Sequence, residues 1–301
     1  MMFGVIGFII GIVLGSFSKV LADRSLNKKT FLGRSYCVYC KHTLAWYDLF
    51  PVLSYILLRG KCRYCHKKIG VDYLVYELSL GVVFAIIFNN LFVSLPAIEL
   101  SYSFIIFALN IIFITFFITV LGIVTLTDLK EMLIPDRIIL PALLIVLIYL
   151  IGVTVYKIYF LYYSLSVTTL GKYLLPPFSD YFYRHALTIS TPLLGSLIMG
   201  ASIGGFFLLL IIITRGKGMG GGDVKLGAFI GLGLSFPMSL VALIFSFLTG
   251  AIVSVLLIIF GKKHFGQTIP FGPFLVLGAI IAIFFGEAIL NWYLNLSLIR
   301  A

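Results

Sequence analysis

Two groups of residues in this chain have the types and spacing that chemistry requires. The first is a set of four cysteines arranged as two C-x-x-C pairs, with 21 residues between the pairs. They are Cys37, Cys40, Cys62 and Cys65. The second group is a pair of carboxylates, Asp128 and Asp223, each placed at the end of a long uncharged stretch. The cysteines are typical of a metal site, and the carboxylates could move protons during hydrolysis.

The cysteine pairs predict a structural zinc site, in which four thiolates surround one ion as a tetrahedron. Two disulfides or unpaired thiols are the alternatives, and the reducing cytosol expected around this loop argues against disulfides. His42 and His66 follow the pairs closely and could replace a thiolate, but four cysteines suffice, so we expect both histidines to be exposed. A closed four-thiolate site leaves no open coordination position, so zinc here should fold the loop rather than hydrolyse a substrate.

The two aspartates predict a different kind of site. Asp128 follows a 28-residue uncharged run and Asp223 precedes one of 36 residues, so both should lie at the cytoplasmic ends of membrane helices, at similar depth. Acids at membrane depth are costly and tend to face a cavity. Two facing carboxylates share one proton and can activate water against a peptide carbonyl. This predicts aspartic protease chemistry, and a cation-coupled transporter or a structural carboxylate pair is the alternative.

A glycine-rich stretch, GKGMGGGDVKLG, surrounds the second aspartate. Gly220, Gly221 and Gly222 directly precede Asp223, and glycine permits unusual backbone angles and close approach of another chain. We therefore expect irregular backbone lining a cavity, which membrane proteins tolerate. A phosphate-binding loop is disfavoured because no G-K-[ST] follows and the aspartate would repel phosphate.

Four other charged residues could assist these sites. Asp136 and Lys130 lie near Asp128 in the sequence and could tune it, although marking the turn at Pro135 is the simpler role. Glu77 and Glu287 lie in apolar runs and could bind substrate or cofactor, although a hydrogen bond between packed helices is the commoner explanation.

The elements that must carry these residues are membrane helices. Hydrophobic residues make up 61% of the 301 residues and charged residues only 11%, far from the composition of a soluble domain. Seven stretches lack charge and histidine, each long enough for one span. They are 2–18, 78–98, 100–127, 138–156, 186–214, 226–261 and 265–286. Because Pro237 divides the 36-residue stretch into a short and a full piece, we expect an all-α polytopic protein with about eight membrane segments, one short or re-entrant.

The distribution of basic residues predicts the orientation. With the N-terminus outside, the inner segments hold 18 Lys and Arg residues and the outer segments hold 4. This bias explains the net charge of +11 without nucleic acid as a partner. The first run lacks the flanks of a signal peptide and is expected to be a retained helix.

Two domains are expected. Residues 1–72 should form the first membrane helix and a small cytoplasmic zinc loop, and residues 73–301 the membrane-embedded domain. Within the second, the aromatic segment 157–191 should form an outer interfacial helix or hairpin, to which no chemistry is assigned.

Three motif blocks resemble the type IV prepilin peptidases, bacterial membrane proteases of the GxGD type. The cysteine block CVYCKHTLAWYDLFPVLSYILLRGKCRYCHKKI is similar to that family's cysteine loop, and TDLKEMLIPDRIILP and GMGGGDVKLGAFIGLG are similar to its two aspartate motifs. GSF at 15–17, YELSLG at 76–81 and IPFGPFLVLGAII from Ile269 also match.

The resemblance implies a function and its parts. It implies that Asp128 and Asp223 are the catalytic pair, which cleaves the leader from prepilins or pseudopilins at the cytoplasmic face of the bacterial inner membrane. It further implies S-adenosylmethionine-dependent methylation of the new N-terminus through the region 1–72, beside structural zinc. Besides the transporter, a zinc-bearing scaffold of a secretion complex is a third reading, in which both aspartates would be replaceable.

The chain departs from the family pattern at three places near the cysteine loop. Val38 stands where proline is usual, and Lys19 where asparagine is usual. GVDYLVYEL replaces the usual Arg-Tyr-Pro before the V-E-L block. These departures put methylation in more doubt than cleavage, because none touches the two aspartates.

Overall fold

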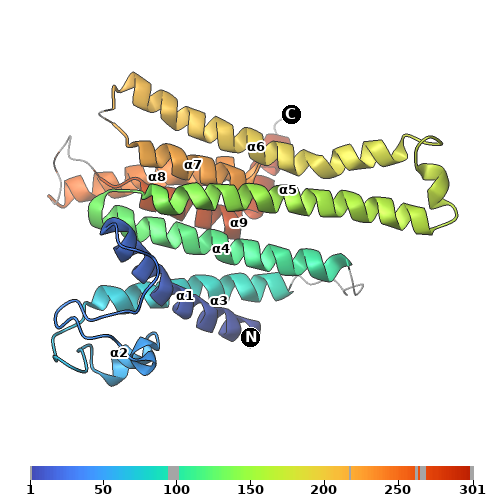
Figure 1. Ribbon diagram of the computed structural model, residues 1–301. Helices are drawn as coiled ribbons and strands as arrows, with labels where there is room; N and C mark the ends of the chain where they lie inside the picture. Colours follow the sequence, from blue (N-terminus) through green and yellow to red (C-terminus); the bar gives the residue numbers. More distant parts are fainter. Residues whose placement is uncertain (1, 94–101, 217, 262–263, 265–268, 299–301) are drawn as a thin grey trace. The chain divides into compact units, whose positions relative to one another are not determined.

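The computed structural model describes residues 2–298 except 94–101, 217, 262–263 and 265–268. The described chain is helical apart from loops and two isolated β-bridges (Figure 1). The helices are α1 (Met2–Leu26), η1 (Trp46–Leu49), α2 (Leu53–Leu57), α3 (Val71–Val93), α4 (Tyr102–Glu131), α5 (Asp136–Val167), η2 (Gly171–Leu174), α6 (Tyr181–Ile213), α7 (Gly221–Leu234), α8 (Met238–Ile259) and α9 (Gly272–Leu298).

Seven of these helices are long and apolar enough to cross a membrane, and α7 is a further, shorter one of 14 residues. Pro237 follows the end of α7 and precedes α8, as the sequence predicts. Proline lacks the N–H that a helix needs and clashes with the preceding turn, which favours a break at this position, although Pro141 and Pro192 lie inside α5 and α6. The all-α fold with about eight membrane segments is confirmed, and the protein is a multi-pass membrane protein.

The chain divides into two compact units. The first comprises residues 1–98 and 114–131, and the second comprises 99–113 and 132–301. Asp128 therefore belongs to the first unit and Asp223 to the second. The expected division at residue 72, which separates a methyltransferase region from a peptidase domain, stays a prediction.

In the first unit, α1 packs against α3 through a row of glycines. A Cβ on Gly7 would lie 2.5 Å from the carbonyl oxygen of Phe84, and one on Gly11 would lie 2.7 Å from that of Leu80. From the other side, a Cβ on Gly81 would lie 2.8 Å from Ile12. Small residues let membrane helices approach until their backbones touch, which gains van der Waals contact that apolar lipid cannot replace. The two ends of the cysteine loop are thereby held by one tightly packed helix pair.

In the second unit, close backbone contact at glycines joins α7, which carries Asp223, to α6, and it joins α9 to α8. A Cβ on Gly231 of α7 would lie 2.6 Å from the carbonyl oxygen of Met199 in α6. A Cβ on Gly278 of α9 would lie 2.2 Å from the carbonyl oxygen of Ala242 in α8. This backbone contact with α6 is one of the contacts that hold the 14-residue α7 in place.

The expected outer segment 157–191 is the meeting of two long helices. α5 has 32 residues and α6 has 33, so they are about 48 Å and 50 Å long, against roughly 30 Å of hydrocarbon. The Tyr162 and Phe182 rings of the two helices lie 5.9 Å apart. The segment is therefore a helical hairpin, one of the two forms expected, closed by η2 and its flanking turns (Figure 1).

Candidate functional site

The cysteine loop contains two knuckles with the same backbone path. In the first, the Cys37 N–H donates to the carbonyl of His42 and the Lys41 N–H donates to the carbonyl of Cys37, both at 2.9 Å. In the second, Cys62 and His66 repeat this pattern with the same lengths. Lys41 and His66, each directly after a pair, have φ values of 59° and 56°. The loop thus holds a small structural repeat, which the sequence shows only as C-x-Y-C.

The knuckles bring the four predicted zinc ligands together. All four Sγ atoms lie within 4.8 Å of one another, and those of Cys37 and Cys65 lie 3.8 Å apart. A tetrahedral ion with Zn–S bonds of about 2.3 Å requires sulfurs about 3.8 Å apart, so the cluster fits zinc. The cysteines form no disulfide. Neither histidine belongs to the cluster; the His42 ring packs 3.8 Å from that of Tyr64 and so links the two knuckles.

Thiolate formation is favoured inside the cluster. Burial opposes ionisation of Cys37, but the backbone N–H groups of Cys40 and Tyr39 and the neighbouring thiols outweigh it. The pKa of Cys37 is lowered to about 7. A thiol near neutrality loses its proton readily to a metal ion, because the thiolate is the ligand.

Asp48 ties the segment between the knuckles to the second knuckle. Its carboxylate is 4% exposed and accepts from Arg63 Nε at 2.7 Å, from Tyr64 Oη at 3.2 Å and from the Ala45 N–H at 3.3 Å. Burial raises the pKa of Asp48, but these donors outweigh it and leave the pKa below its usual value. Burial beside the Tyr47 hydroxyl and this carboxylate raises the pKa of Tyr64 to about 12, so it stays a donor at neutral pH.

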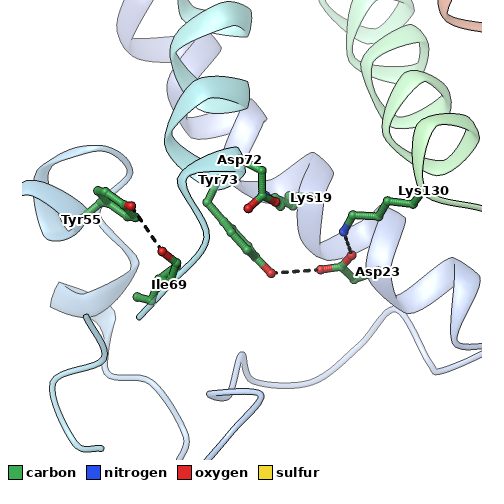
Figure 2. Close-up of polar contacts among 7 residues, drawn as sticks. All are labelled: Lys19, Asp23, Tyr55, Ile69, Asp72, Tyr73 and Lys130. Carbon is green, nitrogen blue, oxygen red and sulfur yellow. Dashed lines mark hydrogen bonds and ion pairs between the residues drawn. The ribbon is translucent and has the colours of Figure 1, made fainter. Parts of the chain in front are cut away.

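A second polar cluster lies where α1, α3 and α4 meet in the first unit (Figure 2). Lys130 Nζ donates to Asp23 at 2.6 Å, and the Tyr73 hydroxyl donates to the other oxygen of Asp23 at 3.5 Å. Lys19, which is 2% exposed, pairs with Asp72 at 2.6 Å and lies 3.1 Å from the centre of the Tyr73 ring. Lys130, expected as a possible tuner of Asp128, thus has Asp23 as an ion-pair partner.

This ion pair joins two of the departures from the family pattern. Lys19 replaces the usual asparagine, and Asp72 lies in the stretch that replaces Arg-Tyr-Pro. The sequence shows them as two unrelated changes 53 residues apart, whereas in the structure they are one contact. The Lys19 ammonium is buried and would be costly without a partner, whereas the Asp72 carboxylate is 62% exposed, so it is the lysine that requires the aspartate.

A cavity of about 730 Å³ lies within the first unit, between the cysteine loop and the helix pair. Its lining includes Lys19 and Tyr73 of the helix pair and Asp48 and Tyr55 of the loop. Glu77, expected as a helix-packing or binding residue, also lines it and accepts the Val52 N–H at 2.8 Å. The loop is therefore fastened to α3 by a carboxylate within the membrane run.

Asp128 lies in the last turn of α4, three residues before the helix ends at Glu131. Its side chain is buried, as is that of the preceding Thr127. This agrees with the sequence prediction of a carboxylate at a helix end. Buried carboxylates are rare unless paired or functional, because desolvation opposes their charge.

Asp223 lies in the first turn of α7 and is also buried. Its carboxylate accepts the N–H of Gly220 at 3.2 Å, which satisfies one of the free donors at the helix start. The helix dipole there also favours a negative charge. The local structure therefore stabilises an ionised aspartate at this position.

The glycines before Asp223 do not form the irregular loop that the sequence suggests. Gly221 and Gly222 are the first residues of α7, and the glycine with positive φ is Gly216, at 74°. A Cβ on Gly222 would lie 2.9 Å from Cβ of Ile134, whereas one on Gly221 meets nothing within 4 Å in the described part of its own unit. Gly221 and Gly222 adopt helical backbone angles, and the Asp223 carboxylate caps this turn by accepting the Gly220 N–H. The expectation of irregular backbone is therefore wrong for Gly221 and Gly222.

Ile134 and Asp136 fasten the start of α5 to the start of α7. The buried Ile134 packs on Gly222, and Asp136 pairs with Lys225. The sequence placed Asp136 near Asp128 and gave no indication that it contacts the Asp223 segment. Only the fold reveals this contact, because the two residues are 89 positions apart. Glu287 is exposed on α9 and borders a small cavity of about 220 Å³.

Comparison with known proteins gives two matching family models. The bacterial peptidase A24 N-terminal domain matches residues 9–91, and the type IV leader peptidase family matches residues 115–255. The first range contains all four cysteines, and the second contains Asp128 and Asp223. No solved structure matches the chain.

Several curated proteins named prepilin leader peptidase/N-methyltransferase are similar over most of their length. The one from Bacillus subtilis is 30% identical over 295 residues, which are 97% of this chain and 98% of that protein. The one from Vibrio cholerae is 28% identical over 92% of this chain and 94% of that protein. The one from Aeromonas salmonicida is 30% identical over 87% and 75%. With similarity over nearly its full length, the chain belongs to the type IV leader peptidase family.

Proposed function

We propose that the protein removes the leader peptide from type IV prepilins or pseudopilins with Asp128 and Asp223, and then methylates the new N-terminus. Membership of the type IV leader peptidase family supports the peptidase activity, and the names of the relatives support both the peptidase and the methyltransferase activity. The transporter alternative finds no support in these matches. The assignment of the two aspartates rests on their motifs, their burial and their positions at helix ends.

In this mechanism the two carboxylates share one proton. The ionised aspartate takes a proton from water as the water oxygen bonds to the scissile carbonyl carbon, and the protonated aspartate donates to the carbonyl oxygen. The tetrahedral intermediate then collapses: the C–N bond breaks and the departing amine nitrogen receives a proton from the first aspartate. The second aspartate recovers its proton from the intermediate's hydroxyl, so the pair returns to its starting state.

The capped position of Asp223 supports its role as the ionised partner. The Gly220 N–H and the helix start stabilise negative charge there. The exposed Gly220 and Gly221 leave room beside it for an extended substrate backbone, because they carry no side chains.

Cleavage of a purified prepilin by the protein in detergent tests the assignment. Asp128→Asn and Asp223→Asn should each lower the rate by at least the 10²–10⁴-fold typical of a lost acid or base. Asp180→Asn, which changes the exposed acid that precedes α6, is the matched control and should cleave normally. Full cleavage by either of the first two variants, with inserted and folded protein, would refute the dyad.

For methylation, we propose that S-adenosylmethionine binds in the 730 Å³ cavity. Its volume lies within the 300–1,000 Å³ range of small-molecule sites. Its lining holds three carboxylates, those of Asp23, Asp48 and Glu77, and seven Lys and Arg residues, so it offers partners both for the sulfonium and amino groups of the cofactor and for its carboxylate. When bound, the cofactor supplies an electrophilic methyl group, and the residues of the cavity would hold it beside the substrate amine.

Binding of labelled S-adenosylmethionine to the purified protein tests this placement independently of turnover. Glu77→Gln should weaken binding, while Asp180→Asn should not. If Glu77→Gln binds the cofactor normally yet retains zinc, the cavity is not the cofactor site.

We further propose that the protein lies in the bacterial cytoplasmic membrane, with zinc in the cysteine cluster and with the catalytic side in the cytoplasm. The bias of 18 basic residues against 4 supports this orientation. Membrane lipid is then an obligatory neighbour, and no feature calls for nucleic acid. Cysteines engineered into the loops can be labelled on intact cells with a membrane-permeant or a membrane-impermeant reagent. The loops that only the permeant reagent labels are cytoplasmic, which measures the orientation.

A further inference from the structure

We propose that helix α2 is an interfacial membrane element: one face of it rests among the lipid headgroups and upper acyl chains at the side of the bilayer from which the cysteine loop emerges. The occupant of this face is lipid. The proposal concerns how the cysteine loop is held, and it stands whether or not Asp128 and Asp223 are catalytic.

The face in question is apolar and exposed. Leu53, Ile56 and Leu57 are 55%, 61% and 71% exposed, and their spacing of three and four residues places them on one side of the helix. None of the three lines the 730 Å³ cavity, whereas Val52 and Tyr55 do. The helix thus has a face toward the cavity and an apolar face that the described residues of the first unit leave largely exposed.

Two hydrogen bonds place this helix beside the start of α3. The N–H of Val52, the residue before α2, donates to Glu77 at 2.8 Å, and the Tyr55 hydroxyl donates to the carbonyl of Ile69 at 3.3 Å. Glu77 is six residues into α3, about 9 Å along its axis. Because helical side chains lean toward the N-terminus, its carboxylate reaches back by roughly one turn.

The start of α3 also carries exposed apolar side chains. Val71 and Val75, one turn apart at the start of α3, are exposed apolar residues of a helix able to span the membrane. α2 is therefore level with the first turn of a helix able to span the membrane, where exposed valines and the 62% exposed Asp72 stand together, as at the edge of a bilayer. An apolar helical face at that level has lipid as its neighbour, and leaving it in water would be unfavourable.

Charge and aromatic content point to the same neighbour. The segment 19–72 holds 11 Lys and Arg residues against three acids, and Arg59 and Lys61 follow α2 directly. Basic residues beside a membrane are attracted to anionic headgroups by about 1 kcal/mol each. Trp46, exposed and in ring contact with Phe50 just before α2, is of a type enriched at membrane interfaces.

Depth-dependent fluorescence quenching of the full-length protein tests the proposal. The chain has two tryptophans, Trp46 and Trp292, so both are replaced by phenylalanine and one reporter is added as Leu57→Trp. Ile56→Trp repeats the measurement at a second position on the same face. Lys67→Trp, exposed on the second knuckle, is the matched control. Each protein is reconstituted in phosphatidylcholine and phosphatidylglycerol vesicles, with and without lipid brominated in the upper acyl chain.

We expect brominated lipid to quench the Leu57→Trp and Ile56→Trp reporters several-fold more than the Lys67→Trp reporter, with aqueous iodide showing the reverse order. Two outcomes would overturn the proposal. If the α2 reporters are quenched by iodide and not by brominated lipid, the face is in water. If they are shielded from both, protein covers it, either another part of this chain or a second copy. Zinc content equal to that of the parent protein shows that each variant retains the folded loop.

Discussion

Each cysteine of the two knuckles contributes one sulfur to a cluster whose spacing suits one zinc ion. Cys62 is the most buried of the four, and its N–H also closes the second knuckle. Removal of its sulfur therefore takes away a ligand at the most buried position of the cluster.

Cys62→Ser should lose the bound zinc and destabilise the cysteine loop, because binding energy of a structural zinc is folding energy. Elemental analysis of the purified protein and limited proteolysis of the loop measure the two effects. His66→Ala is the control: since His66 lies outside the cluster, that variant should keep one zinc per chain. Wild-type protein without metal would remove the basis of this prediction.

Asp48 should make the stability of the loop depend on pH. Its folded pKa lies below its usual value, so its contribution is present above the unfolded pKa, near 4, and is lost as pH falls through the folded pKa. In Asp48→Asn the loss of protection between neutral and acidic pH should be smaller than in the wild type. Protease resistance of the loop in mildly acidic buffers measures this, and equal pH dependence of both proteins would contradict it.

At the residue scale the sequence predicts ligand types well and partners poorly. The zinc ligands are predictable because C-x-x-C spacing is local. The partners of Asp48, Asp136 and Lys19 are not, because each lies at a distance in the chain that only the fold closes.

At the scale of elements, close backbone contact at glycines positions the helices that matter. At the start of α7, two adjacent glycines differ in whether their surroundings leave room for a side chain. Gly222 faces Ile134 without room for a Cβ, and Gly221 has open space within its unit.

This difference predicts different outcomes for two alanine substitutions. Gly222→Ala should push Ile134 away and lower stability by about 1–3 kcal/mol, with a loss of cleavage. Gly221→Ala should leave stability unchanged or raise it slightly, because alanine is the better helix former. Thermal unfolding in detergent and prepilin cleavage are the measurements.

The Gly221→Ala and Gly222→Ala variants also test whether a substrate backbone lies beside Gly221. If it does, Gly221→Ala lowers cleavage while stability is kept. Equal stability loss in both variants would contradict the packing described for α7.

The element boundaries show where sequence reasoning succeeds. The membrane segments and the break at Pro237 follow from uncharged run lengths and from the chemistry of proline, which are local properties. The sequence predicts irregular backbone at the glycines before Asp223, because glycine permits backbone angles that other residues avoid. Capping by Asp223 and contact with Ile134 override that propensity.

At the scale of the whole molecule, the two proposed catalytic aspartates belong to different compact units, but a short stretch of chain joins them. Asp128 precedes Ile134 by six residues, and Ile134 packs on Gly222 beside Asp223. A single chain therefore supplies both carboxylates, so a second copy is not needed to complete the pair.

The dyad should therefore form within a single chain. Vesicles that contain a mixture of the Asp128→Asn and Asp223→Asn proteins should cleave no more prepilin than either variant alone, because each copy has one of the two carboxylates. Separate fluorescent labels on the two variants show that they share vesicles. Recovery of cleavage in the mixture would mean that two copies assemble the site.

The Lys19–Asp72 contact is unequal, because the Lys19 side chain is 2% exposed and the Asp72 side chain is 62% exposed. Loss of the aspartate leaves a buried ammonium with the Tyr73 ring as a remaining neighbour, whereas loss of the lysine leaves a carboxylate that water can solvate. The effects of substitutions at the two positions should therefore not add. The buried lysine depends on a partner that solvent and salt can reach.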